Sequence, residues 1–278
     1  MEQQIERKAG MRWKLYFVLL VLAAVGALGL LPSASSMFAG VQQSAGMSLP
    51  LFMVATFLQT FLLTSVLGFA GLLLSRKTGL GAPVLGSLVY RNGDTTGGTG
   101  SFSSSGSPRT GLGGILALSA VVGLVSGAVI FGVDLLFLLW IEIELTAAAS
   151  APSWWQGLLS SLYGGINEEI MMRLCFLNGL LWLLTLFGRK ATVPWRVWIA
   201  VIVAALIFGI GHLPAARAMM VMSPPMVVRI LVLNLIPGIV FGFLFWKRGL
   251  LSAMTAHFSA DVLMHAALPL LLPSLAGG

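Results

Sequence analysis

Charged residues are scarce in this chain. Asp, Glu, Lys and Arg together make up 9% of its 278 residues, whereas hydrophobic residues make up 58%. A soluble domain carries about 25% charged residues, so this chain has too few charges to cover a water-exposed surface. The composition therefore excludes a soluble enzyme and a disordered chain, and it indicates a protein whose solvent is the lipid bilayer.

Cysteine is also nearly absent. The single cysteine, Cys175, cannot form an internal disulfide, which excludes a secreted disulfide scaffold. The net charge of +7 resembles that of a nucleic-acid-binding protein, but the basic residues stand beside long apolar runs, where they are typical of membrane loops. We therefore expect membrane lipid, and no nucleic acid, as a partner.

Long apolar runs are abundant. A helix that crosses a bilayer needs about 20 mostly apolar residues, and the runs predict an all-α polytopic transmembrane helix bundle of about seven spans. An extra short helix within 214–228 would make eight. The seven predicted spans are Leu15–Leu31, Pro50–Leu74, Leu112–Ile141, Trp155–Phe187, Val197–Leu213, Ile230–Trp246 and Leu250–Leu272.

The distribution of positive charge predicts the orientation of these spans. With the N-terminus in the cytoplasm, 13 of the 16 Lys and Arg residues fall in cytoplasmic segments, as the positive-inside rule requires. Arg217 and Arg229 fall in predicted outer loops, and Arg173 lies inside a span. Because the loops are short and no eukaryotic targeting signal is present, we expect an integral protein of a bacterial cell membrane.

A polar stretch divides the chain. Residues 91–110 consist largely of Gly, Ser and Thr, a composition typical of a flexible linker. The predicted organisation is an N-terminal tail with two transmembrane helices (1–90), a Gly/Ser-rich cytoplasmic linker (91–110) and a five-helix transmembrane bundle (111–278).

Ionisable side chains inside the predicted spans are the strongest functional signal. Such residues are costly in lipid and mark functional sites. All of them lie in the five C-terminal spans, and the first two spans contain none. They are Asp134, Glu168, Glu169, Arg173, His212, His257, Asp261 and His265.

Their spacing brings several of them onto shared helix faces. Glu169 and Arg173 are four residues apart and can pair, whereas Glu168 points about 100° away. His257, Asp261 and His265 form an i, i+4, i+8 stripe. At about 1.5 Å per residue, Glu169 lies roughly 27 Å from the inner boundary, and His257 and Asp261 roughly 12 to 18 Å. A shared site therefore requires a tilt or a late helix start.

Two carboxylates and two imidazoles that face one cavity can activate water. The same donors suit a divalent metal such as zinc, with Glu168, His212 and His257 as its candidate ligands. The sequence contains no G-x-S-G, H-E-x-x-H or G-x-G-D motif, which excludes the serine, zinc and aspartyl intramembrane protease chemistries that these motifs mark. A hydrolytic centre would thus depend on the Glu and His set.

Three motifs occur in order, each in a separate span. They are E-E-x-x-x-R at 168–173, F-x-x-x-H at 208–212 and H-x-x-x-D at 257–261. With these motifs the chain resembles the CPBP family (CAAX protease and bacteriocin-processing, also called Abi) of intramembrane endopeptidases. The resemblance implies that Glu168 and His212 activate the attacking water and that Glu169 and Arg173 form a structural ion pair. It also implies that His257 and Asp261 support the oxyanion.

Asp261 departs from family members that carry Asn at this position. An ionised Asp cannot donate a hydrogen bond to an oxyanion, so Asp261 must be protonated, orient His257 or ligate a metal. Both a metalloprotease mechanism and a metal-free glutamate mechanism fit the motifs.

The predicted function is hydrolysis of peptide bonds in a membrane-associated protein or peptide by water that Glu and His activate. The alternatives are a catalytically silent membrane scaffold, a bacteriocin-immunity protein that binds a membrane partner, and a proton-coupled carrier. Outside the motifs, Asp134 is predicted to form a hydrogen bond between helices. His265 is predicted to pack in the core or to support a site residue, and the Phe208 ring is expected to pack against His212.

Overall fold

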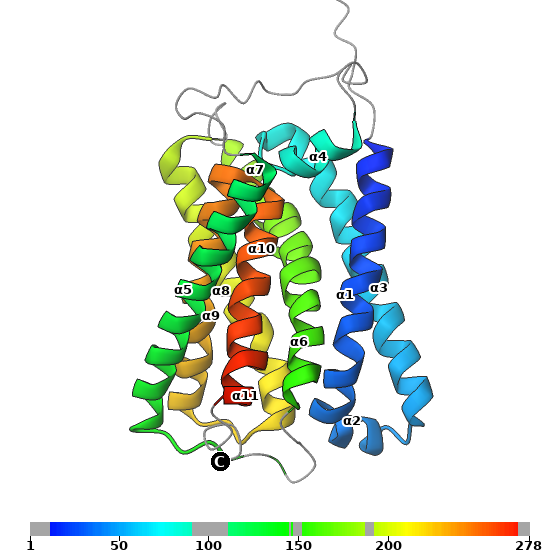
Figure 1. Cartoon of the computed structure of the whole chain (residues 1–278), viewed down its shortest axis with the longest axis vertical. Helices are drawn as coiled ribbons and strands as arrows, with labels where there is room; N and C mark the ends of the chain where they lie inside the picture. Colours follow the sequence, from blue (N-terminus) through cyan, green and yellow to red (C-terminus); the bar gives the residue numbers. More distant parts are fainter. Residues whose placement is uncertain (1–11, 91–110, 145, 147–151, 187–191, 272–278) are drawn as a thin grey trace, which may run out of the picture.

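The computed structural model describes residues 12–90, 111–144, 146, 152–186 and 192–271, and most of these residues are helical, with no strand among them (Figure 1). The predicted all-α class is therefore confirmed, while the predicted linker 91–110 lies outside the described residues. In chain order the elements are α1 (Trp13–Met37), α2 (Ala39–Ser44), α3 (Leu49–Thr78), α4 (Pro83–Val89), α5 (Leu112–Leu138), α6 (Trp154–Leu162), η1 (Tyr163–Glu168), η2 (Ile170–Leu177), α7 (Asn178–Thr185), α8 (Pro194–Met219), α9 (Pro224–Arg248), α10 (Leu250–Asp261), η3 (Val262–Ala267) and α11 (Leu268–Leu271); the three η segments are π-helical.

Five of these helices, namely α1, α3, α5, α8 and α9, are long and apolar enough to cross a membrane. The other two predicted spans are divided by π-helical turns. One is the run 154–185, formed by α6, η1, η2 and α7, and the other is the run 250–271, formed by α10, η3 and α11. In Figure 1, α1 begins at the end of the molecule opposite to α11, as an odd number of crossings requires. The seven-span arrangement therefore stays a prediction.

The structure corrects the predicted segment between the fifth and sixth spans. No separate short helix lies within 214–228: α8 continues through Pro214 to Met219, and α9 begins at Pro224. The hydroxyl of Ser223 accepts a hydrogen bond from the backbone N–H of Met226 (3.3 Å), and this cap with proline at the first helical position starts α9 early.

Arg217 and Arg229 consequently lie in helices and not in loops, so their predicted loop positions were wrong. Arg229 forms a bidentate ion pair with Asp134 of α5, with Nε–Oδ1 and Nη2–Oδ2 distances of 2.6 and 2.9 Å. Asp134 thus joins α5 to α9, which confirms its predicted role as a hydrogen-bonding group between helices.

The helix contacts place the run 154–185 at the centre of the molecule. It packs against α1 and α3 on one side and contacts α8 and α10 on the other, while α5 covers α10 and α8 pairs with α9 (Figure 1). The side chains of Leu15, Leu72, Leu174 and Phe241 belong to one buried core. The two N-terminal helices are therefore in direct contact with the helix that carries the first motif.

The Asp134–Arg229 pair gives a test of this packing. We expect Asp134→Leu to reduce the free energy of unfolding by about 3 kcal/mol, because it leaves a half-buried guanidinium without its counter-charge. The double variant Asp134→Leu/Arg229→Leu should recover most of this loss, since apolar side chains can replace a buried ion pair. Thermal unfolding in detergent micelles measures both. A double variant that is less stable than the single one would contradict this role of the pair.

Candidate active site

The first motif lies in a stretch of π-helix. Glu168 ends η1, and Arg173 lies within η2, with Glu169 between the two segments. π-Helical turns in a longer helix are frequent at functional sites. They also hold more residues per turn than an α-helix, so the run 154–185 spans less depth than the same number of α-helical residues. This compression helps to bring Glu169 level with His257, which straight helices would separate.

Glu169 is fully buried and holds two partners. Its Oε2 atom lies 3.3 Å from Nε of Arg173, one helical turn away, and its Oε1 atom is 2.8 Å from Nδ1 of His257 on α10. The guanidinium of Arg173 also lies over the ring of Phe208 on α8, 5.4 Å from the ring centre. The predicted Glu169–Arg173 pair is therefore present and links the first motif to the other two.

Glu168 points toward a different set of groups, as its position one residue earlier requires. Its Oε1 atom lies 3.9 Å from Nε2 of His212, and its Oε2 atom lies 3.7 Å from Nε2 of His257. Both gaps are too long for direct hydrogen bonds, but one water molecule can hydrogen-bond to all three groups. The Glu168 side chain is 16% exposed, so the site is accessible to such a molecule.

The partners of His212 fix its orientation. Nδ1 lies 2.8 Å from the carbonyl oxygen of Phe208, and the His212 ring packs edge-on against the Phe208 ring with centres 4.5 Å apart. Because a carbonyl oxygen can only accept a hydrogen bond, Nδ1 carries the hydrogen. The Nε2 atom that faces Glu168 is then the acceptor in the neutral ring. At 36% exposed, His212 forms the open side of the site.

His257 is the most enclosed of the three histidines. Its ring stacks on Phe241 of α9 with centres 4.8 Å apart, and its Nδ1–H donates to Glu169. Its Nε2 atom faces two carboxylates, those of Glu168 and Asp261. A ring held by Phe241 on one face and by Glu169 at Nδ1 presents Nε2 in one fixed direction, which is the requirement for a group that binds a reacting atom.

Asp261 lies next to His257, with 3.5 Å between Oδ2 and Nε2. The missing side chain of Gly164 makes this approach possible, since a Cβ atom there would overlap Oδ2 of Asp261 and lie 3.2 Å from Nε2 of His257. Of the three roles open to Asp261, orientation of His257 is the one that this contact supports.

His265 continues the same stripe at the molecular surface. Its side chain is 59% exposed, and its Nε2 atom lies 4.0 Å from Oδ1 of Asp261. The expectation of core packing was therefore wrong for His265, and a contact to a site residue remains. Among the described residues, Asp134 is bound to Arg229 of α9 and not to these groups.

The three motifs lie in a part of the chain that is similar to a known family. A family model described as "Type II CAAX prenyl endopeptidase Rce1-like" matches residues 150–263, the part of the chain that contains all three motifs. This match supports the resemblance of the chain to the CAAX protease (CPBP) family. No curated protein and no solved structure matches it. The family is one of membrane proteases, so the resemblance found in the three motifs is confirmed.

The donor groups of this site can be compared with the requirements of a metal ion. Among residues 12–271 that the structure describes, no group of three or more His, Cys, Asp or Glu side chains is placed to hold an ion. The candidate ligand set of Glu168, His212 and His257 therefore gains no support from the geometry.

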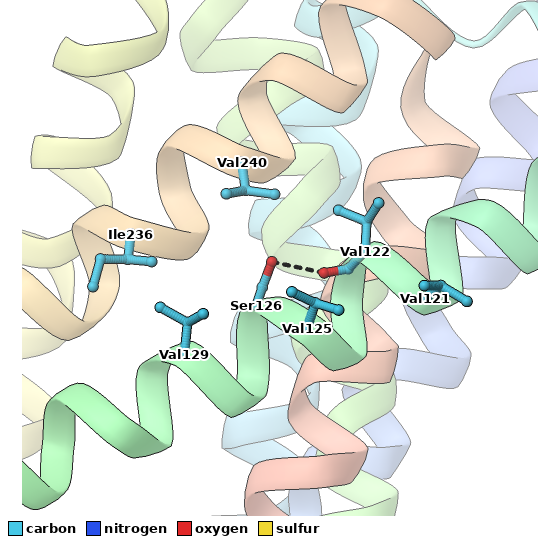
Figure 2. A pocket seen from close by; sticks show the side chains of 7 residues that line it. All are labelled: Val121, Val122, Val125, Ser126, Val129, Ile236 and Val240. Atoms are coloured by element: carbon cyan, nitrogen blue, oxygen red, sulfur yellow. Dashed lines mark hydrogen bonds between the residues drawn. The ribbon is translucent and has the colours of Figure 1, made fainter.

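A separate apolar groove lies between α5 and α9 (Figure 2). It has a volume of about 300 Å³, and Ser126 is its one polar lining residue. The Ser126 hydroxyl donates to the carbonyl oxygen of Val122 (2.8 Å), so it offers no free donor to a ligand. The ionisable residues of the CAAX protease motifs are not among the lining residues, and the groove is therefore distinct from the candidate active site.

Two residues of this site could not be found from the motifs. Phe241 is one of many apolar residues in a span, and no spacing signal separates it from the lipid-facing ones. Gly164 belongs to a Gly-Gly pair just before the acidic pair, and small residues where helices meet closely are a known signal. That signal could have identified Gly164, but not its contact with Asp261.

Gly164 provides a test of the site geometry. We expect Gly164→Ala to lower the rate of peptide hydrolysis by about 10²-fold. The added methyl group would displace the side chains of Asp261 and His257, and small displacements of positioned groups are costly to catalysis. Gly179→Ala is the matched control on the same helical run, since its Cβ would meet only Leu74 at an ordinary 3.7 Å. Initial rates per folded protein are compared. Equal activity in the two variants would show that the contact at Gly164 does not set the geometry.

Proposed function

We propose that this protein is an intramembrane endopeptidase that hydrolyses peptide bonds of a membrane-associated protein or peptide. The observation that carries the proposal is the position of the Glu168 carboxylate, which lies within 4 Å of Nε2 atoms from two histidines on two other helices. This arrangement supports the activation of one water molecule by groups from all three motifs. The match of residues 150–263 to the model of a protease family supports the same reaction class.

In the proposed mechanism, water binds between Glu168 and His212. Glu168 accepts a proton from this water as its oxygen attacks the carbonyl carbon of the scissile bond, and Nε2 of His212 orients the water by accepting its second hydrogen. Attack yields a tetrahedral intermediate with a negatively charged oxygen. The protonated Glu168 then donates its proton to the leaving nitrogen, so that the C–N bond breaks and the carboxylate returns to its starting state.

His257 is the proposed partner of the oxyanion. In its doubly protonated form it donates through Nδ1 to Glu169 and through Nε2 to the developing oxyanion. The carboxylates of Glu168, Glu169 and Asp261 surround the ring and supply the counter-charge for this form. Asp261 acts as a positioning residue for His257, and the Glu169–Arg173 pair holds His257 from its other side.

The proposed setting is a bacterial cell membrane that seven helices cross, with the N-terminus in the cytoplasm. The excess of Lys and Arg in the predicted cytoplasmic segments supports this orientation. In this arrangement residues 111–278 form the catalytic bundle, and the helices of 1–90 pack against it.

Replacement of the general base tests the reaction directly. We expect Glu168→Gln to lower the rate of cleavage by about 10²- to 10⁴-fold, because glutamine has the shape of glutamate but cannot accept the proton. Glu142→Gln, outside the motifs, is the control and should retain wild-type activity. Cleavage of a membrane-anchored reporter by purified protein in liposomes measures both. A Glu168→Gln variant with full activity would reject the mechanism and favour a scaffold or a carrier.

Chelation tests the part of the proposal that concerns metal. Because the described residues provide no set of three ligands, we expect cleavage to persist after dialysis against EDTA and 1,10-phenanthroline. The measurement is the cleavage rate together with the metal content of the protein. Loss of activity that zinc restores, accompanied by stoichiometric zinc in the active protein, would instead support a metalloprotease.

A further inference from the structure

Asn167, the residue immediately before Glu168, points away from the candidate active site. Its side chain is completely buried. Its amide nitrogen donates to the carbonyl oxygen of Ala23 on α1 and to Oγ1 of Thr64 on α3, each at 3.1 Å. One side chain of the first-motif helix therefore binds both N-terminal helices at once.

This contact reduces the folding free energy that burial of the side chain could provide. The Asn167 Oδ1 atom is buried and makes no hydrogen bond among the described residues, and a buried polar atom without a partner costs about 1–3 kcal/mol. An apolar side chain of similar size would avoid that cost. Stability alone therefore gives no reason for an asparagine here, whereas directional hydrogen bonds fix the rotation of a helix more strictly than apolar contacts do.

The backbone of α1 packs closely against the side-chain amide of Asn167. A Cβ atom at Gly26 would overlap Oδ1 of Asn167, so α1 reaches the motif helix only because residue 26 has no side chain. Asn167 and Glu168 are neighbours in η1. A rotation that freed Asn167 would turn Glu168 away from His212 and His257, since the two side chains move with one backbone.

We propose that Asn167 is a positioning residue, held by Thr64 and by the backbone of α1 at Ala23, that fixes Glu168 against His212 and His257. The inference rests on the proposed peptidase function. It gives Ala23 of α1 and Thr64 of α3 an indirect part in the position of Glu168, although the three motifs all lie beyond residue 167.

The structure supplies a matched control on the same two elements. At the C-terminal end of α3, the Thr78 hydroxyl donates to Oδ1 of Asn178 (2.6 Å), and the Asn178 amide donates to the carbonyl oxygens of Leu80 and Leu174. This second Thr–Asn contact also joins α3 to the run 154–185, but it lies ten residues beyond Glu168. It should contribute to stability and leave the position of Glu168 unchanged.

The test compares Thr64→Val, Thr64→Ser and Thr78→Val in the full-length protein. We expect Thr64→Val to lower kcat by about 10- to 10²-fold with little change in KM, and Thr64→Ser, which keeps the hydroxyl, to restore activity to within about threefold of wild type. Thr78→Val should keep the wild-type kcat. This should hold even if Thr78→Val lowers the melting temperature as much as Thr64→Val does. Equal kcat in Thr64→Val and Thr78→Val would overturn the inference.

A second measurement is independent of activity. Cysteines introduced as Glu168→Cys and His212→Cys, with Cys175→Ala, should form a disulfide more slowly in the Thr64→Val background than in the Thr78→Val background. Equal rates would also reject the positioning role. The two proposals fail separately: full activity of Glu168→Gln contradicts the peptidase function, whereas an inactive Glu168→Gln with equal kcat in the two valine variants contradicts only the role of Asn167.

Discussion

A buried carboxylate in a low-dielectric interior must be neutralised, and the way Glu169 meets this requirement organises the site. Neither the protein interior nor lipid can replace the hydration of an ionised group, so a partner charge has to be supplied nearby. Arg173 supplies it from the next turn, and His257 binds the other oxygen from α10. Arg173 also packs on Phe208 of α8. One carboxylate thus sets the relative positions of all three motif helices.

Glu168 is different because its neighbours do not satisfy it directly. Its two oxygens face imidazole nitrogens across gaps of 3.7 and 3.9 Å, and its side chain remains partly exposed. The adjacent acids therefore have separate tasks that follow from their surroundings. In the proposed mechanism the buried acid is structural, and the accessible acid binds water and exchanges a proton.

The parts of this site that the sequence predicts are those set by spacing along one helix. The Glu169–Arg173 pair, the His257–Asp261–His265 stripe and the packing of Phe208 on His212 all follow from residues four positions apart. Contacts between helices are harder to predict from sequence, because they depend on the rotation of each helix about its axis and on its depth in the membrane. The partner of Asp134 was missed because Arg229 was assigned to a loop, and Phe241 carries no local signal. Nor does the sequence show that two π-helical segments shorten the first-motif helix.

Glu168 and His212 are proposed to act on the same water molecule, and a double-mutant cycle on kcat tests this most directly. Groups that act as one unit give strongly non-additive losses. We predict that Glu168→Gln combined with His212→Ala reduces kcat no further than the more damaging single substitution. If the losses of the two single variants multiply in the double variant, the two side chains act independently and the shared water molecule is contradicted.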